Sequence, residues 1–250
     1  RGTMRIAFTT FGCKINQYET DVMRQAVAGT GNVVVPFSDD ADVYVINTCS
    51  VTAKSDYQCR QSLRAAVRRK PNAHIIVTGC YAETRPEEVQ SIPGVSQIVR
   101  MGEKSNISRY LPEGGEAPSA LSAGGSAAPL RTRAFLKIQD GCDNRCSYCI
   151  IPFARGRSRS IHYEEVIRLF EQAIASEAPE IVMSGIHIGR YGSDLIPQSS
   201  LGELLRDLVS RKQQHRIRLS SIEANEVTPE IIELLGRGLC RHLHVPLQSG

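Results

Sequence analysis

The 250-residue sequence has no long hydrophobic run. Its longest apolar stretches, such as Ile75–Val77 and Ile181–Met183, have the length of a strand. The N-terminal residues lack the apolar stretch that a signal peptide or a membrane-spanning helix needs. We therefore expect a cytoplasmic protein that makes no use of a membrane.

The sequence also lacks a strong excess of charge of either sign. Its 30 Lys and Arg against 26 Asp and Glu give a net charge of +4, which permits a polyanionic partner without requiring one. No Walker-type phosphate loop and no Ser/His/Asp arrangement is present, and the six histidines show no metal-binding spacing. With 41% hydrophobic residues, the chain is neither disordered nor fibrous.

One stretch, residues 112–130, is rich in Gly, Ala, Ser and Pro and has no apolar periodicity. Such a composition is typical of a flexible linker. It divides the chain into a first domain, residues 1–111, and a second, residues 131–250.

In the first domain, short β-branched runs alternate with amphipathic helical patterns. This alternation predicts an open parallel sheet of the flavodoxin or Rossmann type, with helices on its faces. Asn16 and Glu19 have the spacing of a capping box at the start of the first helix, Gly29 is placed to end it, and a second helix should span 53–69. The expected strands are Arg5–Thr9, Val33–Phe37, Val43–Asn47 and Ile75–Thr78.

The second domain continues the alternation and predicts a partial (β/α) barrel. Expected helices include one with Val166 and Phe170 on its apolar face, and two at 201–208 and 229–235. Only four strands precede the last residue, whereas a closed barrel needs more, so we expect a truncated barrel. These strands are Phe135–Ile138, Ile181–Ser184, Ile217–Ser220 and Leu243–Val245.

Cysteine is the most informative residue type, because eight cysteines in a chain without a secretory signal indicate metal, cluster or catalytic thiols. Cys142, Cys146 and Cys149 form a CxxxCxxC motif after the first strand of the second domain. Three thiolates on one loop suit three corners of a [4Fe-4S] cluster and leave the fourth iron open to a ligand. Zinc is the alternative, but it usually takes paired CxxC units and four closed ligands.

Cys13, Cys49 and Cys80 each follow a predicted strand of the first domain. The carboxyl ends of parallel strands lie at one edge of a sheet, so we expect these three thiols to converge there and to hold a second cluster. The alternative is three inert core cysteines. Cys59 and Cys240 are expected to be structural.

The motifs around both triads closely resemble those of the methylthiotransferases, a family of radical S-adenosylmethionine (SAM) enzymes. The resemblance covers nearly the whole chain outside 112–130. It implies an auxiliary [4Fe-4S] cluster on Cys13, Cys49 and Cys80, and a catalytic radical SAM cluster on Cys142, Cys146 and Cys149. The segments that carry it are Phe11–Gln17, Asn47–Thr52, Thr78–Ala82, Gln139–Cys149 and His244–Gly250.

The segments Gly12–Thr20 and Ser184–Gly192 look most like the branch that adds a methylthio group to C2 of N6-threonylcarbamoyladenosine beside the anticodon of tRNA. That resemblance implies a tRNA anticodon stem-loop as partner, SAM as cofactor, a reductant such as flavodoxin or ferredoxin, and a monomer. Sister branches modify isopentenyladenosine in tRNA or an aspartate of a ribosomal protein. A non-catalytic iron–sulfur electron-transfer protein is the alternative from another class.

Contacts to SAM are expected where barrel strands end, at the mouth of the fold. A structural role for the residues at these strand ends, capping helices and closing the strands, is an equally supported alternative to SAM binding. The expected contacts are Tyr148, Ser184, Gly185, Ser221, Glu223 and Gln248.

Two groups of arginines are candidates for phosphate binding. Arg60, Arg64 and Arg68 recur on the second helix, where a solvated face is the favoured interpretation. Arg155, Arg157 and Arg159 follow the cluster loop, and for them we favour RNA or cofactor binding. His187 lies on a strand-end loop, where a polar loop residue without a chemical task is the favoured interpretation and a substrate contact is the alternative.

Overall fold

The computed structural model describes residues 2–50, 52–112 and 132–248. Its contacts divide the chain into two units, one of Arg1–Gly125 with Arg145–Arg155 and one of Ser126–Asn144 with Gly156–Gly250. The expected linker at 112–130 lies, except for residue 112, outside the described residues. The segment Arg145–Arg155 thus packs with the first unit, although it follows the first strand of the second in sequence.

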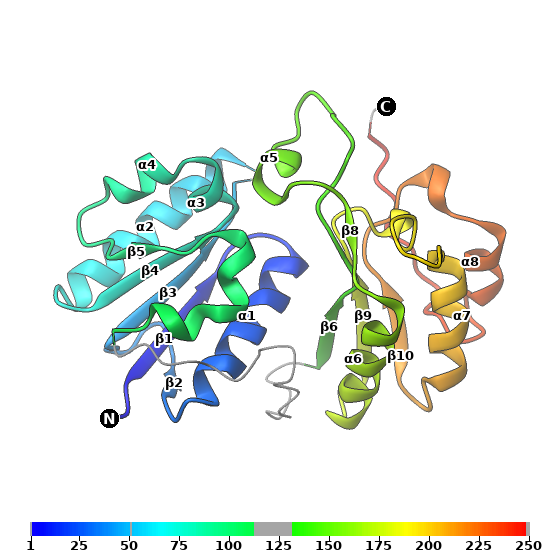
Figure 1. Cartoon of the computed structure of the whole chain (residues 1–250), viewed down its shortest axis with the longest axis horizontal. Coiled ribbons are helices and arrows are strands. Elements are labelled where there is room, and N and C mark those ends of the chain that lie inside the picture. Colours follow the sequence, from blue (N-terminus) through cyan, green and yellow to red (C-terminus); the bar gives the residue numbers. More distant parts are fainter. Residues whose placement is uncertain (1, 51, 113–131, 249–250) are drawn as a thin grey trace. The chain divides into compact units, whose positions relative to one another are not determined.

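The first unit is built on a five-stranded parallel sheet with the strand order β2-β1-β3-β4-β5 (Figure 1). This is the flavodoxin-like order, so the predicted open parallel sheet is confirmed. The strands are β1 (Arg5–Thr10), β2 (Val33–Val35), β3 (Val43–Thr48), β4 (His74–Gly79) and β5 (Gln97–Ile98). The helices are α1 (Lys14–Ala28), α2 (Ala53–Arg69), α3 (Cys80–Thr84), α4 (Pro86–Gln90), the 3-10 segment η1 (Met101–Tyr110) and α5 (Ile151–Arg155).

Helices cover both faces of this sheet because alternate strand residues point to opposite sides. Ile6 and Phe8 of β1 pack with residues of α1 and η1, whereas Ala7 packs with residues of α2, α3 and α4. Figure 1 shows α1 on one side of the sheet and α2 and α4 on the other.

The start of α1 differs from the sequence expectation. Its N-cap is Cys13, without a side-chain capping bond, and Asn16 and Glu19 lie buried inside the helix. Both side chains are taken by tertiary partners: the Asn16 amide donates to the carbonyl oxygens of Phe11 and Thr48, and Glu19 accepts from buried cations. The predicted capping box is therefore wrong, while Gly29 ends the helix as predicted.

The prediction for α2 is confirmed at Ala53–Arg69, and its N-cap is Thr52, whose hydroxyl accepts from the Ser55 N–H at 3.1 Å. Strand β2 is shorter than expected. It ends at Val35 because Pro36 has no N–H to continue the ladder.

The second unit contains a three-stranded parallel sheet in the order β10-β9-β6 and a two-stranded antiparallel pair of β7 with β8. The strands are β6 (Arg133–Lys137), β7 (Gln139–Asp140), β8 (Arg159–Ser160), β9 (Glu180–Ser184) and β10 (Arg216–Leu219). The helices are α6 (Tyr163–Ala175), α7 (Leu201–Arg211), α8 (Pro229–Leu234) and the 3-10 turns η2 (Ile188–Arg190) and η3 (Ala224–Glu226).

The fourth strand expected at Leu243–Val245 does not form. The segment makes only an isolated bridge between Ser221 and His244, and Pro246, one residue beyond Val245, has no N–H for a longer ladder. The other three predicted strands and all three helices of the second domain are present within a few residues of their expected bounds.

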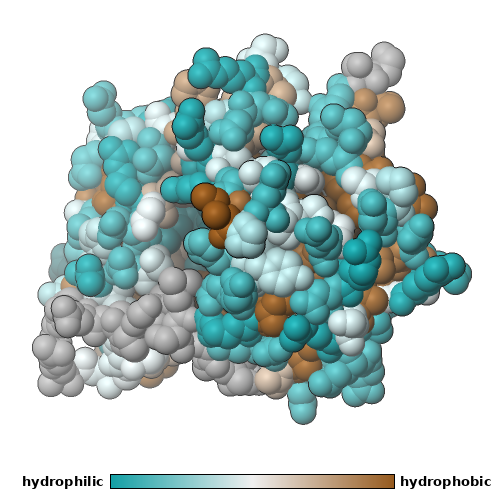
Figure 2. Space-filling view, turned by 45° about the vertical axis from the view of Figure 1, so that its right-hand side comes forward, coloured by the Kyte–Doolittle hydropathy of each residue, from teal (hydrophilic) through white to brown (hydrophobic). Residues whose placement is uncertain are grey.

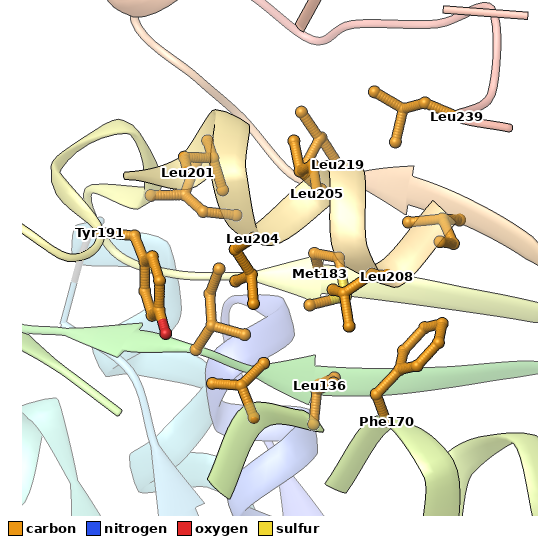
Figure 3. Close-up of a cluster of buried hydrophobic side chains, with 14 of the residues drawn as sticks. Leu136, Phe170, Met183, Tyr191, Leu201, Leu204, Leu205, Leu208, Leu219 and Leu239 are labelled. Atoms are coloured by element: carbon orange, nitrogen blue, oxygen red, sulfur yellow. The ribbon is translucent and has the colours of Figure 1, made fainter. Parts of the chain in front are cut away.

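In the core of the second unit, leucines of α7 pack against residues of the sheet (Figure 3). Leu204, Leu205 and Leu208 are fully buried against Leu136 of β6 and Met183 of β9, and α7 begins with a capping box between Ser200 and Glu203. This core fixes the strand ends from which the loops of the unit emerge.

The surface in Figure 2 is largely hydrophilic, with hydrophobic residues in small scattered groups. Among the described residues, no helix combines the length and apolarity needed to cross a bilayer.

Candidate functional site

Cys13, Cys49 and Cys80 follow three neighbouring strands at the carboxyl edge of the first sheet. Strand pairing places Thr10 opposite Asn47 and Thr48 opposite Gly79, so β1, β3 and β4 end side by side. Cys49 and Cys80 come directly after β3 and β4, and Cys13 caps α1 three residues beyond β1. The topology therefore brings together the three cysteines of the first predicted triad.

Two glycines allow these chain segments to approach closely. A Cβ at Gly12, with φ of +94°, would lie 2.5 Å from Cys49 Sγ. A Cβ at Gly79, with φ of +100°, would lie 2.2 Å from the Thr48 carbonyl oxygen and 2.7 Å from Asn47 Oδ1. Only glycine fits both the positive φ and the contact distances, so the close approach is specified by sequence.

The three thiols differ in exposure and interact electrostatically. Cys13 is exposed, whereas Cys49 and Cys80 are buried. The pKa of the Cys80 thiol is raised, mainly by burial. The nearby thiols of Cys13 and Cys49 add to this increase, and the charges of Arg155 and Lys104 oppose it. These mutual effects agree with a shared site open to solvent on the side of Cys13.

Three cysteine thiols are a donor set that suits an iron–sulfur cluster. A [4Fe-4S] cluster brings its own iron and sulfide, so each thiolate binds a different corner and the three need not meet at one point. Within residues 2–50, 52–112 and 132–248, no three His, Cys, Asp or Glu side chains form a group that could hold a single metal ion. Gly12 lets the segment with Cys13 pack directly against Cys49.

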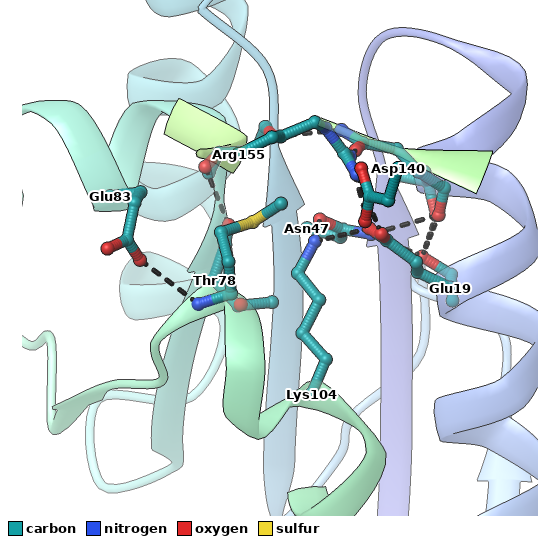
Figure 4. A network of polar contacts seen from close by, with 12 residues as sticks. Glu19, Asn47, Thr78, Glu83, Lys104, Asp140 and Arg155 are labelled. Carbon is teal, nitrogen blue, oxygen red and sulfur yellow. Dashed lines mark hydrogen bonds and ion pairs between the residues drawn. The ribbon is translucent and has the colours of Figure 1, made fainter. Parts of the chain in front are cut away.

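A buried polar network, part of which is drawn in Figure 4, includes Lys104 and Arg155, whose charges act on Cys80. Lys104 Nζ donates to Glu19 Oε2 at 2.6 Å and to Asn47 Oδ1 at 3.0 Å. The Arg155 guanidinium donates to Glu19 Oε1 at 2.8 Å and to Asn16 Oδ1 at 2.6 Å. Burial lowers the pKa of Lys104, and the adjacent Glu19 carboxylate raises it. We call Asn16, Glu19, Asn47, Lys104 and Arg155 the buried network.

The loop with the second triad is shared between the two units. Cys146 and Cys149 belong to the first unit, where the Cys149 N–H donates to the Cys146 carbonyl oxygen at 3.0 Å. Helix α5 follows two residues after Cys149 and contacts α3, which begins with Cys80. Within the first unit, the helix that begins with Cys80 therefore contacts the helix that follows Cys149.

Cys142 belongs to the second unit and is held there by its neighbours. Its N–H donates to the Gly156 carbonyl oxygen at 3.0 Å, and its Sγ lies 3.5 Å from Nδ1 of His187. Nε2 of His187 lies 2.7 Å from the Glu226 carboxylate, so the imidazole bridges a thiol and a carboxylate. His187 therefore has a defined role in orienting Cys142, which the sequence expectation did not give it.

Gln139 secures the same region of the second unit. Its side chain is fully buried. Its Oε1 accepts from the backbone N–H of His187 at 2.8 Å, and its Nε2 donates to the Gly141 carbonyl oxygen at 2.8 Å. A Cβ at Gly141, with φ of +72°, would lie 2.0 Å from the Arg157 carbonyl oxygen. The backbone leading to Cys142 is thus fixed from two sides.

The residues expected to bind SAM are brought together only in part. Glu223 accepts from Gln248 Nε2 at 3.1 Å, and Ser221 Oγ lies 2.7 Å from His244 Nδ1. Ser184 is buried, and its hydroxyl donates to the Val182 carbonyl oxygen at 3.3 Å. Gly185 lies against Gln139, and Tyr148 is 75% exposed.

The two groups of arginines predicted to bind phosphate differ from the expectation in their exposure. Arg155, expected to bind RNA or cofactor, is instead fully buried in the network, whereas Arg157 and Arg159 are exposed. On α2, Arg64 and Arg68 are exposed as on a solvated face, but half-buried Arg60 donates to Tyr81 Oη at 3.1 Å and to Glu88 Oε1 at 3.2 Å.

Sequence patterns did not reveal Lys104 or Glu226, because their partners Glu19 and His187 are distant in sequence. Lys104 lies within the 3-10 segment η1, whose sequence carries little periodic signal. The only available signal was Glu19, an acidic residue on the apolar face of α1.

Comparison with known proteins finds two family models along the chain. Residues 5–100 match the model of the uncharacterized protein family UPF0004, and residues 136–250 match that of the radical SAM superfamily. Among solved structures, the radical SAM methyltransferase TsrM of Kitasatospora setae, with tryptophan substrate and a SAM analogue bound, has a TM-score of 0.65 at 14% identity, over 97% of this chain and 59% of its own. That likeness shows the fold.

Two curated relatives are threonylcarbamoyladenosine tRNA methylthiotransferases named MtaB. The protein of Bacillus subtilis is 42% identical over 98% of this chain, and that of Thermotoga maritima is 36% identical over 99%. The chain spans 58% of the length of each. With both family models matched in order and these identities over nearly its whole length, the chain belongs to the radical SAM methylthiotransferase family.

Proposed function

We propose that the protein of which this chain is part uses SAM and two [4Fe-4S] clusters to add a methylthio group to C2 of N6-threonylcarbamoyladenosine in tRNA. The relatives that carry this activity in their names are up to 42% identical to the chain. The alternative substrates are isopentenyladenosine in tRNA and an aspartate of a ribosomal protein. The experiment below tests the proposal against them.

The observation that carries the proposal is a helix contact in the first unit, which brings the segment after Cys149 against the helix that begins with Cys80. Helix α3 begins with Cys80, α5 follows Cys149, and the two helices are in contact. A protein that only passes electrons has no need to bring two open clusters to one substrate. An enzyme that joins a sulfur donor to an activated adenine does.

In this proposal each triad has its own task. Cys13, Cys49 and Cys80 would hold the auxiliary cluster, and Cys142, Cys146 and Cys149 the catalytic one. When bound, these groups and SAM supply the sulfur, the methyl group and the one-electron chemistry that an unactivated C–H bond requires. The chain's own residues would shape the site around them: Gly12 lets the Cys13 segment pack closely against Cys49, and His187 would orient Cys142.

SAM binding is assigned to the strand ends of the second unit. The paired side chains of Glu223 and Gln248 follow β10 and present amide and carboxylate groups that can bond a nucleoside or an amino acid moiety. Ser184 and Gly185 end β9, where backbone groups rather than the buried Ser184 hydroxyl would reach the ligand. Exposed Tyr148 offers a flat surface for stacking.

For tRNA, exposed Arg157 and Arg159 are the proposed phosphate contacts, since they follow the loop with the second triad. We further propose a cytoplasmic monomer that receives electrons from a reductant such as flavodoxin or ferredoxin.

The test is mass spectrometry of tRNA nucleosides from cells with the gene intact, deleted, or replaced by a Cys80→Ala variant. The proposal expects 2-methylthio-N6-threonylcarbamoyladenosine in the first strain only, with the unmodified threonylcarbamoyl nucleoside accumulating in the other two. Loss of the methylthio mark from isopentenyladenosine instead would assign the protein to the sister branch. Unchanged nucleosides in all strains would refute a role in tRNA.

A further inference from the structure

From the buried network we infer that Arg155 is a positioning residue, which clamps the segment with Cys146 and Cys149 to the sheet edge occupied by Cys13, Cys49 and Cys80. Arg155 contacts none of the proposed substrates; it acts through α1. This inference rests on the proposed function, because the spacing that it sets is the spacing between the two clusters.

Arg155 ends α5, which begins two residues after Cys149. Its side chain is fully buried, and its donors reach Glu19 at 2.8 Å and Asn16 at 2.6 Å, both on α1. A guanidinium binds a carboxylate and an amide together in one fixed plane, which fixes orientation as well as distance. The end of the segment is therefore fastened at a defined angle.

The other end of this clamp lies at the first triad. Helix α1 begins directly after Cys13, and the amide of Asn16 donates to the carbonyl oxygen of Thr48, the residue before Cys49. Asn47 joins the network through Lys104. A shift of Arg155 would therefore move the backbone at the first triad.

The helix contact supports the same conclusion independently. Helix α5 packs against α3, whose first residue is Cys80, so the segment touches the sheet edge at a second place. A helix of five residues has little stability of its own, and its position must come from such tertiary contacts. Arg155 is the buried charged contact among them.

Replacement of Arg155 should leave the unit folded. Glu19 keeps its 2.6 Å bond to Lys104 when the guanidinium is removed, so the carboxylate does not lose its counter-charge. Arg155→Met removes the clamp, and Arg155→Lys keeps the charge but lacks the planar fork. Arg100→Met is the matched control, because the Arg100–Glu83 pair, at 3.2 Å, is an exposed ion pair of the same unit.

The first measurement is hydrogen–deuterium exchange of the complete protein without its metal. We expect the amides of 149–155 to exchange at least about tenfold faster in Arg155→Met, less so in Arg155→Lys, and unchanged in Arg100→Met, while β1, β3 and β4 stay protected in all. Unchanged exchange at 149–155 would overturn the inference. So would loss of protection across the whole unit, because Arg155 would then support the fold and not the segment.

The second measurement is electron paramagnetic resonance of the anaerobically reconstituted protein with both clusters reduced. The magnetic interaction between the clusters should become weaker or more variable in Arg155→Met and stay unchanged in Arg100→Met. An identical interaction in Arg155→Met would overturn the inference. Hydrogen–deuterium exchange is measured on the metal-free protein and requires neither cluster nor substrate. It tests this inference alone, whereas the analysis of tRNA nucleosides tests the proposed function.

Discussion

At the scale of single residues, Glu19 is the carboxylate on which two buried cations depend. It is 7% exposed and bonds both Lys104 and Arg155. Loss of one partner from a buried ion pair leaves an uncompensated charge, which is far more costly than loss of an exposed pair.

We therefore predict that Glu19→Gln lowers the free energy of unfolding by about 3–5 kcal/mol, measured by urea denaturation of the metal-free protein. The amide cannot neutralise Lys104, whose pKa is already lowered by burial. Glu88→Gln, which breaks a partly exposed pair with Arg60, is the control and should cost less than about 1 kcal/mol. Equal effects of the two substitutions would show that the buried network does not stabilise the fold.

Cys59 is a second residue with a sharp expectation. It is fully buried in α2, its Sγ lies 3.8 Å from the Cys49 carbonyl oxygen, and burial raises its pKa from 9.0 to about 12. The pKa of the Cys59 thiol is higher in the folded protein than in the unfolded one. Its contribution to the free energy of unfolding is therefore complete below about pH 9 and is lost as the pH rises toward 12.

In the native metal-free protein at pH 8.5, Cys59 should therefore resist alkylation while exposed Cys146 reacts, as mass spectrometry of peptides can show. The free energy of unfolding should fall between pH 9 and 11 by up to about 1.4 kcal/mol per pH unit, and less so in Cys59→Ala. Alkylation of Cys59 as fast as Cys146 would contradict its burial.

At this scale, sequence reasoning reaches local patterns better than distant contacts. Spacing and strand ends single out six cysteines, whose role as cluster ligands stays a prediction. The contacts of Lys104, His187 and Glu226 could not be predicted, because each has a partner far away in the chain. Asn16 and Glu19 have the spacing of a capping box, but tertiary contacts took both side chains.

At the scale of elements, the turn between β4 and α3 determines the position of Cys80. Gly79 adopts a φ of +100°, and its Cα lies so close to β3 that a side chain would overlap the backbone of Thr48. A substitution there must either move Cys80 or separate the two strands.

Gly79→Ala should thus cost roughly 2–4 kcal/mol of stability and reduce the iron bound on reconstitution, since strain and overlap act at the same position. Gly102→Ala is the matched control, because a Cβ there meets nothing within 4 Å, and its effect should stay below about 1 kcal/mol. Denaturation curves and iron analysis of the two variants check the prediction. Normal iron binding by Gly79→Ala would show that the turn does not position the triad.

Element prediction was accurate where hydrophobic periodicity was strong, as for α2 and the central strands β1, β3 and β4. It missed β5 and η1, because a two-residue strand and a 3-10 segment carry little periodic signal. The strand expected at Leu243–Val245 was apolar enough, but in the structure it makes only one bridge. Apolar sequence alone does not create a ladder partner.

At the scale of the whole molecule, the flavodoxin-like order of the first sheet explains how cysteines far apart in sequence reach one edge. The segment Arg145–Arg155 then adds Cys146 and Cys149 to the same unit. We therefore propose, as the central claim, that the two triads hold two separate clusters with different tasks.

The most direct test of this claim is formation of 5′-deoxyadenosine by the complete protein after anaerobic reconstitution with iron and sulfide, with dithionite and SAM as the other reactants. Three proteins are compared: wild type, one with Cys13, Cys49 and Cys80 changed to Ala, and one with Cys142, Cys146 and Cys149 changed to Ala. Iron content should fall from about eight atoms per chain to about four in each variant. Wild type and the first variant should form 5′-deoxyadenosine, and the second should not. Loss of all iron in either variant, or 5′-deoxyadenosine from the second, would contradict two separate clusters with separate tasks.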